Sequence, residues 1–136
     1  MTYVAVIDTN VIVSALLKEE SNPGKIISYI RNETIIPVYD EDILKEYNEI
    51  LHKEKFHFTE EQINDLFTLF KIHGRVLNET KTDEFFKDKT DIKFFQIVLT
   101  ANMIQDSYLV TGNLKHFPQR VFVINPAMMV DMIESN

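Results

Sequence analysis

The sequence predicts an α/β fold in which a mostly parallel β-sheet carries helices on both of its faces. Short apolar segments that are typical of buried strands alternate along the chain with segments of helical periodicity, as in proteins with parallel sheets. No repeat, low-complexity tract or linker interrupts this alternation, and the scarcity of Gly predicts a compact fold with few long loops. The length is that of one domain, over residues 1–136.

The first half of the chain is expected to hold two strands and four helical segments. Residues 4–7 are apolar and mostly β-branched, as in a central strand that is buried on both faces. Ser21, with a Pro two residues later, and Asp40 are each suited to cap a helix. Thr59 and Gln62 form a capping box. In chain order, we predict a strand over 3–8, helices over 11–17 and 22–30, a strand over 35–39, and helices over 41–52 and from 59 to about 73.

The second half continues the alternation. Gly74 is suited to end the preceding helix, and a short strand over 75–77 follows it. We then predict a helix over 91–103 and strands over 108–111 and 121–124. Asn125, followed by a Pro, is suited to cap a final helix.

The composition excludes several classes of protein. The absence of Cys rules out disulfides, a thiolate zinc site and a Cys nucleophile, and fits a reducing cytoplasm, where we expect the protein to act. No apolar stretch approaches the length of a membrane span, and no signal peptide is recognisable, so no membrane association is expected. The net charge of -7 favours a basic partner. It neither supports nor excludes a nucleic-acid substrate, because bound cations would offset it locally.

Two acids stand where chemistry is expected. Asp8 follows the first predicted strand directly, and ligands of α/β sheets bind outside the carboxyl ends of the strands. On the helix predicted from residue 41, Glu46 lies three residues after Ile43 and four before Ile50. It therefore borders the apolar stripe and can lean over the sheet edge, whereas Glu49 points further away. The alternative for Glu46 is an ordinary solvated glutamate.

The helix predicted over residues 91–103 has a carboxylate on its apolar side. Asp91 is in line with Phe95 and Val98, and a buried charge without a partner is costly, which favours a functional role. The alternative is that Asp91 only complements the helix dipole. Asp88 is an N-cap or an outer ligand, and the cap is favoured. The polar face of this helix is expected to hold Lys93, Gln96 and Thr100.

Small and polar residues also follow the strand predicted over 108–111. Asn113 offers a neutral oxygen at the sheet edge, although Gly-Asn is equally a turn signal. Lys115 and His116 come next, and one of them could contact a phosphate, whereas a loop His is more often only solvated.

Asp8, Glu46 and Asp91 together are suited to bind a divalent cation. Carboxylates that converge from separate elements repel one another and raise each other's pKa values. A hard divalent cation such as Mg²⁺ relieves this repulsion, because it prefers oxygen ligands. Such a site can activate water and stabilise the charge of a phosphoryl group during in-line displacement.

The segments that carry these residues resemble the PIN domain across nearly the whole chain. In order, they read Ile-Asp8-Thr-Asn10, Ile-Leu-Lys-Glu46, Asp91-Ile-Lys-Phe-Phe and Leu-Val-Thr-Gly-Asn113. The opening Val-Ile-Asp-Thr-Asn-Val-Ile-Val-Ser-Ala-Leu-Leu and the late Val-Thr-Gly-Asn-Leu-Lys-His-Phe-Pro are similar to the branch of PIN toxins from toxin–antitoxin systems.

The resemblance implies a three-layer fold around a five-stranded sheet and an endoribonuclease that depends on Mg²⁺ or Mn²⁺. It implies cleavage of single-stranded RNA to 5′-phosphate and 3′-hydroxyl ends, a small antitoxin protein as partner, and a homodimer, which is common in the family. Asp8, Glu46 and Asp91 correspond to the catalytic acids that bind the metal. Asn113 stands where many PIN domains have a fourth acid, which puts a second metal ion in doubt. Supporting roles fall to Thr9, Asn10 and Thr111.

Two rival functions follow from the same residues. A PIN-fold module that has lost catalysis and only binds RNA or protein is favoured by Asn113 and by the acidic net charge, but the intact trio of acids argues against it. A phosphatase with an Asp nucleophile after the first strand usually needs a second Asp two residues later, and this chain has Asn10 there. Fold similarity alone does not decide between these functions.

Overall fold

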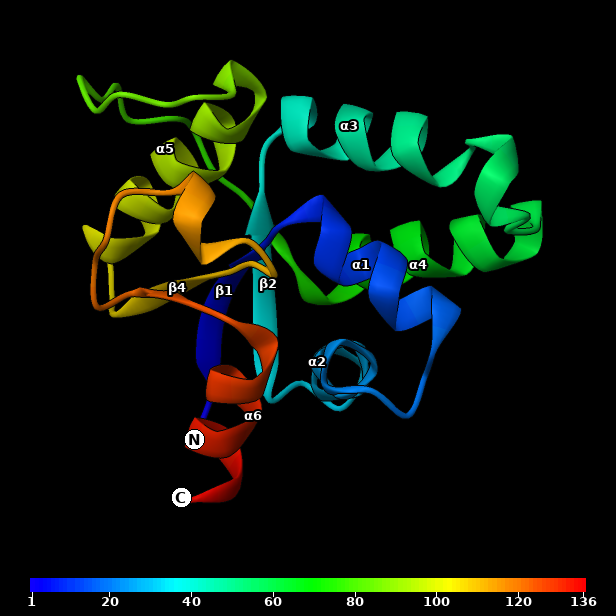
Figure 1. Ribbon diagram of the computed structural model, residues 1–136. Coiled ribbons are helices and arrows are strands. Elements are labelled where there is room, and N and C mark those ends of the chain that lie inside the picture. The colour runs from blue at the N-terminus through cyan, green and yellow to red at the C-terminus, as the bar shows by residue number, and fades with distance from the viewer.

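The five strands form one parallel sheet. In the computed structural model, which describes residues 1–136, the strand order is β3-β2-β1-β4-β5, and every neighbouring pair of strands is parallel (Figure 1). The predicted α/β class with a five-stranded parallel sheet is confirmed. The strands are β1 (Tyr3–Ile7), β2 (Ile35–Tyr39), β3 (Arg75–Val76), β4 (Ser107–Val110) and β5 (Val123–Ile124).

The central strand β1 brings the candidate residues together. All five of its residues are buried, as expected for an apolar strand with neighbours on both sides and helices above and below. Ile7 pairs with Val110 of β4, so the residues that follow, Asp8 and Thr111, lie at the same carboxyl edge. The backbone N–H of Asp8 donates to the carbonyl of Val110 at 2.9 Å, which continues the ladder by one residue.

Four of the six helices begin where the sequence supplies a capping side chain. The side chains of Ser21, Asp40 and Asn125 each accept a hydrogen bond from a backbone N–H in the first turn of their helix, and Thr59 forms the predicted capping box with Gln62. No helix has both the length and the apolar composition that crossing a bilayer demands. The helices are α1 (Thr9–Leu17), α2 (Asn22–Arg31), α3 (Glu41–Leu51), α4 (Glu60–His73), α5 (Ile92–Asn102) and α6 (Pro126–Glu134).

Helices pack on both faces of the sheet. On one face, α5 contacts β1, β2 and β4. On the other, α2 contacts β2 and also packs against α1, α4 and α6, so that most helices lie to one side of the strands in Figure 1. Helix α3 contacts both α1 and α5, which places it across the carboxyl edge of the sheet. The core, a cluster of 33 buried apolar residues, lies between these layers.

The structure corrects several predicted boundaries. Helix α1 begins at Thr9 rather than at residue 11, because Asp8 already takes the extended conformation of an N-cap, and β1 therefore ends at Ile7. Strand β4 starts and ends one residue earlier than predicted, and β5 is limited to its last two predicted residues. Three short 3₁₀ helices, η1 (Glu54–Phe56), η2 (Lys89–Asp91) and η3 (Leu114–His116), complete the order of elements.

The expectation of few long loops is wrong for one segment. Residues 77–88 have no helix or strand, although they contain no Gly. This segment is held by the buried ring of Phe86, whose centroid lies 5.6 Å from that of Phe95 and 6.1 Å from that of Phe117, both in edge-to-face geometry. Hydrogen bonds to neighbouring elements, such as that from the backbone N–H of Leu77 to the carbonyl of Tyr39, also hold the segment.

Candidate active site

Asp8 lies buried at the end of β1. Its side chain caps no helix N–H, although it sits at the N-cap of α1, and one of its oxygens, Oδ2, accepts a hydrogen bond of 2.7 Å from the hydroxyl of Thr111. Burial raises the pKa of Asp8 to about 6; the Thr111 hydrogen bond opposes this rise, and repulsion by Asp91 and Glu46 adds to it. The Asp8 carboxylate is thus held in place by Thr111, but no cationic side chain balances its negative charge.

Glu46 reaches the same edge from α3. The Thr9 hydroxyl donates to Glu46 Oε2, and Nζ of Lys93 lies 2.7 Å from Glu46 Oε1. Only about a fifth of each side chain is exposed in this ion pair, at 20% for Glu46 and 19% for Lys93. Glu46 is therefore not a solvated surface glutamate, but its charge is already balanced by an ammonium group.

Asp91 is the last residue of η2 and the N-cap of α5. Its Oδ2 atom is buried and accepts no hydrogen bond, and the basic side chain that lies beside it is His116, whose Nδ1 is 3.6 Å away. Burial is the largest cause that raises the pKa of Asp91, followed by repulsion from Asp88, and Glu46 adds to it. A buried carboxylate oxygen without a donor is costly, so this oxygen is suited to accept a hydrogen bond or to bind a cation.

The remaining predicted residues frame these acids. Asn10 Oδ1 accepts a hydrogen bond from the backbone N–H of Gly112, which links α1 to the end of β4. The backbone N–H of Asn113 donates to the Thr111 hydroxyl at 3.0 Å, while its side chain is exposed and makes no hydrogen bond. Asp88 is an N-cap, as favoured, because its Oδ1 accepts from the backbone N–H of Thr90 at 2.9 Å.

The comparisons with known proteins decide the family. A profile of the PIN domain matches residues 4–115, which is most of the chain. The protein belongs to the PIN domain family. The chain is also 31% identical, over 111 residues, to the uncharacterized protein MJ1680 of Methanocaldococcus jannaschii; the match covers 79% of this chain and 69% of that protein. No solved structure matches the chain. PIN domains are generally nucleases, and these nucleases generally use divalent metal ions.

The acids of this PIN domain can be tested against the metal that the family uses. No three His, Asp or Glu side chains are arranged so that they could together hold one ion, and Glu46 is engaged by Lys93 and Thr9. Asp8 and Asp91 have no lysine or arginine partner, Asp91 repels Asp8, and the buried Oδ2 atom of Asp91 accepts no hydrogen bond. Since Mg²⁺ needs only one or two carboxylates beside its waters, this pair of donors fits a hard divalent cation.

Three residues at the site of this PIN domain have contacts that the sequence does not predict. The sequence places Lys93 only on a polar helix face, and for His116 it leaves open a phosphate contact or plain solvation; half of the His116 side chain is exposed, and it lies beside Asp91. Tyr47 is fully buried, and its hydroxyl donates to the carbonyl of Ile7, directly before Asp8. The position of Tyr47 next to Glu46 in the sequence was the available signal.

One predicted orientation is wrong. Gln96 is buried instead of lying on an exposed polar face, because the segment after β3 covers it, with the backbone N–H of Thr80 donating to its carbonyl at 3.4 Å. Glu49 is exposed, as expected for a residue further from the apolar stripe than Glu46, although both line the same hollow between α3 and α5. Glu41 lines a different hollow, between α3 and α4, and is therefore the better control residue on this helix.

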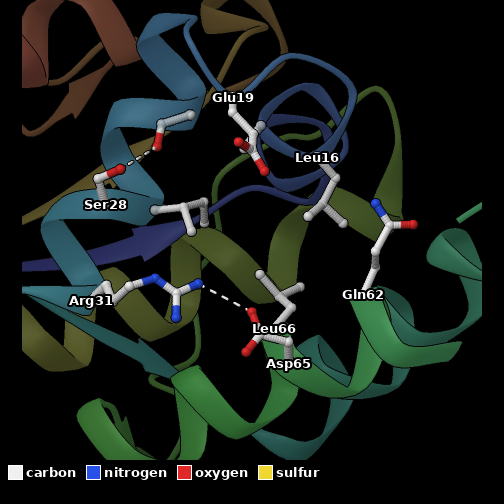
Figure 2. Close-up of a pocket in the computed structure, with 10 residues that line it drawn as sticks. Leu16, Glu19, Ser28, Arg31, Gln62, Asp65 and Leu66 are labelled. Carbon is white, nitrogen blue, oxygen red and sulfur yellow. Dashed lines mark hydrogen bonds and ion pairs between the residues drawn. The ribbon is translucent and has the colours of Figure 1, made fainter. Parts of the chain in front are cut away.

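A separate hollow of about 240 Å³ lies between α1, α2 and α4 (Figure 2). Leu16 and Leu66 form part of its apolar lining, and an ion pair of 3.1 Å between Arg31 and Asp65 crosses its rim. Gly24 is required here, because a Cβ atom would lie 2.0 Å from the carbonyl oxygen of Glu19. None of these residues belongs to the acidic cluster.

Proposed function

We propose that this PIN domain is an endoribonuclease that cleaves single-stranded RNA with the help of Mg²⁺ or Mn²⁺. The observation that supports the proposal most strongly is the pair Asp8 and Asp91. Asp8 is buried and Asp91 is half-buried at the carboxyl edge of the sheet, both have raised pKa values, and the buried Oδ2 atom of Asp91 accepts no hydrogen bond. A site with this unmet negative charge favours a divalent cation over a purely structural role.

The proposal gives each residue a definite task. Asp8 and Asp91 would hold the ion, and Thr111 keeps Asp8 oriented through its hydrogen bond to Oδ2. When bound, the ion supplies a Lewis acid that activates water and balances the charge on the phosphoryl group. Glu46, tied to Thr9 and Lys93, fixes the distance between α1, α3 and α5 around this edge. The expected products carry 5′-phosphate and 3′-hydroxyl ends.

The test is cleavage of a labelled single-stranded RNA by the purified protein in Mn²⁺, with a chelator as the negative control. Asp91→Asn is expected to lose at least about a hundredfold in rate, the scale of removing one preorganised electrostatic group. Glu41→Gln, an acid-to-amide change on the far side of α3, is expected to cleave at the wild-type rate. Equal losses in both variants would contradict the proposed site.

Metal binding can be measured without catalysis. Mn²⁺ is expected to raise the melting temperature of the wild-type protein, because an ion that binds only the folded state stabilises it. Asp8→Asn and Asp91→Asn should reduce this rise, and Glu41→Gln should leave it intact. A melting temperature that does not respond to saturating Mn²⁺ would overturn the metal site.

We propose further that the nuclease is the toxin of a toxin–antitoxin pair. The support is the resemblance of its first and last motifs to that branch of the family. Expression of the wild-type chain should arrest growth, expression of Asp8→Asn should not, and co-expression of the product of an adjacent small reading frame should restore growth. Absence of growth arrest with a demonstrably active nuclease would refute the toxin role alone.

One observation favours a second candidate, a PIN module that binds RNA or protein without cleaving it. Lys93 balances Glu46, and no three acids are arranged around one ion. If this candidate holds, RNA binds but remains intact at every Mn²⁺ concentration, and Asp91→Asn leaves binding unchanged or tightens it.

A further inference from the structure

The region between β4 and α6 differs in charge from the rest of the chain. The protein carries 21 acidic and 14 basic residues, yet residues 107–130 contain no Asp or Glu. The same stretch contains Lys115, His116 and Arg120. The exposed side chains of this stretch therefore include cations but no carboxylates, and exposed cations attract anionic partners.

This region forms a groove rather than a flat surface. A hollow of about 550 Å³ is lined by cationic and apolar side chains together, with no acid among them. Lys115 and Arg120 provide the cations. Val121 is 95% exposed, Met128 46% and Leu114 39%, so an unusual amount of apolar surface faces solvent there.

The groove is held open by the fold. Phe117 is buried beneath it and contacts Phe86 edge-to-face, which anchors the loop. Val123 of β5 and Met128 of α6 contribute to its lining from elements of the fold. In Figure 1 the chain between β4 and α6 passes a short turn beside α5 and then runs along the sheet before it enters α6.

The turn η3 links the groove to the candidate active site. Leu114 and Lys115, which line the groove, follow Asn113 directly, and His116, in the same 3₁₀ turn, lies 3.6 Å from Asp91. A strand whose phosphate lies at the acidic cluster therefore needs only to follow this turn to reach the groove.

From these contacts we propose that the groove binds the single-stranded RNA on one side of the scissile phosphate. Lys115 and Arg120 contact backbone phosphates, and Leu114, Val121 and Met128 contact base faces. This inference rests on the proposed function and extends it to the path of the substrate. Mixed cationic and apolar grooves suit single strands, because charge follows the backbone while the bases find apolar surface.

The opposite side of the acidic cluster is a poorer path. The hollow between α3 and α5 also contains lysines, but acids outnumber them. Its charged lining consists of Lys45, Lys89, Lys93, Asp42, Glu46, Glu49 and Glu79. In the groove, by contrast, Lys115 has no ion-pair partner, and the pair between Arg120 and Glu84 is partly exposed, so it offers little resistance to exchange for a phosphate.

The test compares two double variants that remove the same charge. In the Asp8→Asn background, which prevents cleavage, binding of a labelled oligouridylate is measured by fluorescence anisotropy along a salt series. Lys115→Ala/Arg120→Ala should bind about tenfold more weakly, and its log–log salt slope should be smaller by about 1.4, since each contact with a single strand contributes about 0.7. Lys53→Ala/Lys71→Ala, at exposed positions outside the groove, should match the parent.

The apolar part of the groove has its own comparison. Val121→Glu places a negative charge at an almost fully exposed position and should weaken binding of the same probe severalfold. Ile72→Glu, also exposed but on α4, should not. Neither position is packed in the core, so both variants are expected to fold.

The outcomes separate the two proposals. If the wild-type protein cleaves RNA but both double variants bind alike, the groove inference is overturned and the nuclease proposal stands. If the wild-type protein neither binds nor cleaves RNA, both are overturned. If Val121→Glu instead dissolves a dimer, seen by sedimentation, and leaves RNA binding unchanged, the groove is a self-association surface and the inference is wrong.

Discussion

The ammonium of Lys93 lies 2.7 Å from a carboxylate oxygen of Glu46, so one of the three acids at the sheet edge already has a cation. The pair joins α3 to the first turn of α5, and about four-fifths of each side chain is buried. An ion pair with this little exposure is costly to break from one side, because the remaining charge is left without compensation. Lys93 therefore limits how much negative charge the site offers to a metal ion.

We expect Lys93→Met to lower the metal-free stability of the protein and to tighten Mn²⁺ binding. The variant leaves Glu46 with Thr9 as its remaining donor, which should cost about 1–3 kcal/mol in the free energy of unfolding. The released carboxylate adds one negative charge, and a roughly tenfold gain in Mn²⁺ affinity corresponds to about 1.4 kcal/mol. Chemical denaturation in chelator and calorimetric titration of Mn²⁺ measure the two effects.

Lys45→Met is the matched control, because Lys45 is exposed and lines the same hollow but does not pair with Glu46. An equal gain in Mn²⁺ affinity for Lys45→Met would show that only the net charge matters.

The contrast between Asp8 and Lys93 shows how far the sequence predicts the site. The placement of Asp8 follows from local information, because an apolar strand that stops at a carboxylate projects it at the sheet edge in any parallel α/β arrangement. The side of α3 that carries Glu46 follows from helical phase, whereas Asp91 lies in η2, just before the helix that is predicted to begin with it. The pairing of Lys93 with Glu46 cannot be predicted in this way, since it depends on how closely two helices, far apart in the chain, approach each other.

The same limit explains the errors in the fold. Helix starts were predicted well where a capping side chain marks them, as at Asp40 and Thr59. Gln96 was assigned to an exposed face because its phase is polar, but the irregular segment after β3 covers it. The apolar residues of that segment follow neither helical nor strand periodicity, so its structure cannot be predicted from them. The anchoring role of Phe86 is evident only from its contacts with Phe95 and Phe117 in the folded protein.

The pKa of Asp8 makes the stability of the metal-free protein depend on pH. Its pKa is 3.8 in the unfolded chain and about 6 in the folded protein, so the folded state holds the proton more tightly. The stabilisation that comes from protonated Asp8 is fully present below pH 3.8 and is lost as the pH rises through about 6. The loss amounts to about 3 kcal/mol.

Asp8→Asn should therefore be more stable than the wild-type protein above pH 6, by up to about 3 kcal/mol, and the difference should shrink toward pH 4. Urea denaturation in chelator across this range measures it. Asp106→Asn, at an exposed position before β4, should show no such pH-dependent difference. A constant offset between Asp8→Asn and wild type at all pH values would contradict the raised pKa.

Tyr47 of α3 holds the carboxyl end of β1 in place through a hydrogen bond. Its buried hydroxyl donates to the carbonyl of Ile7, and the helix that carries it also carries Glu46. Tyr47→Phe should cost about 1–2 kcal/mol in the free energy of unfolding, because it leaves a buried carbonyl without this donor. It should also weaken Mn²⁺ binding, since Asp8 directly follows that carbonyl.

The control for this variant is Tyr108→Phe on β4, which removes a hydroxyl that makes no hydrogen bond within the chain and should change neither quantity. If Tyr47→Phe loses stability but binds Mn²⁺ with wild-type affinity, the hydroxyl stabilises the fold without positioning Asp8.

Asn113 provides the last prediction, because its side chain is exposed and unbonded at the edge where Asp8 and Thr111 meet. Asn113→Asp should keep the fold, since no hydrogen bond of the side chain is lost. It should tighten Mn²⁺ binding and can add a second ion, because affinity for a hard cation grows with the number of charged ligands. Asn113→Ala should weaken binding less than Asp8→Ala does, since it removes a dipole rather than a charge.

Asn64→Asp, on the exposed side of α4, adds the same charge far from the acids and serves as the control in calorimetric titrations at one pH and one salt concentration. If Asn113→Asp changes affinity and stoichiometry no more than Asn64→Asp does, Asn113 does not face the metal, and it serves only as a turn residue after β4.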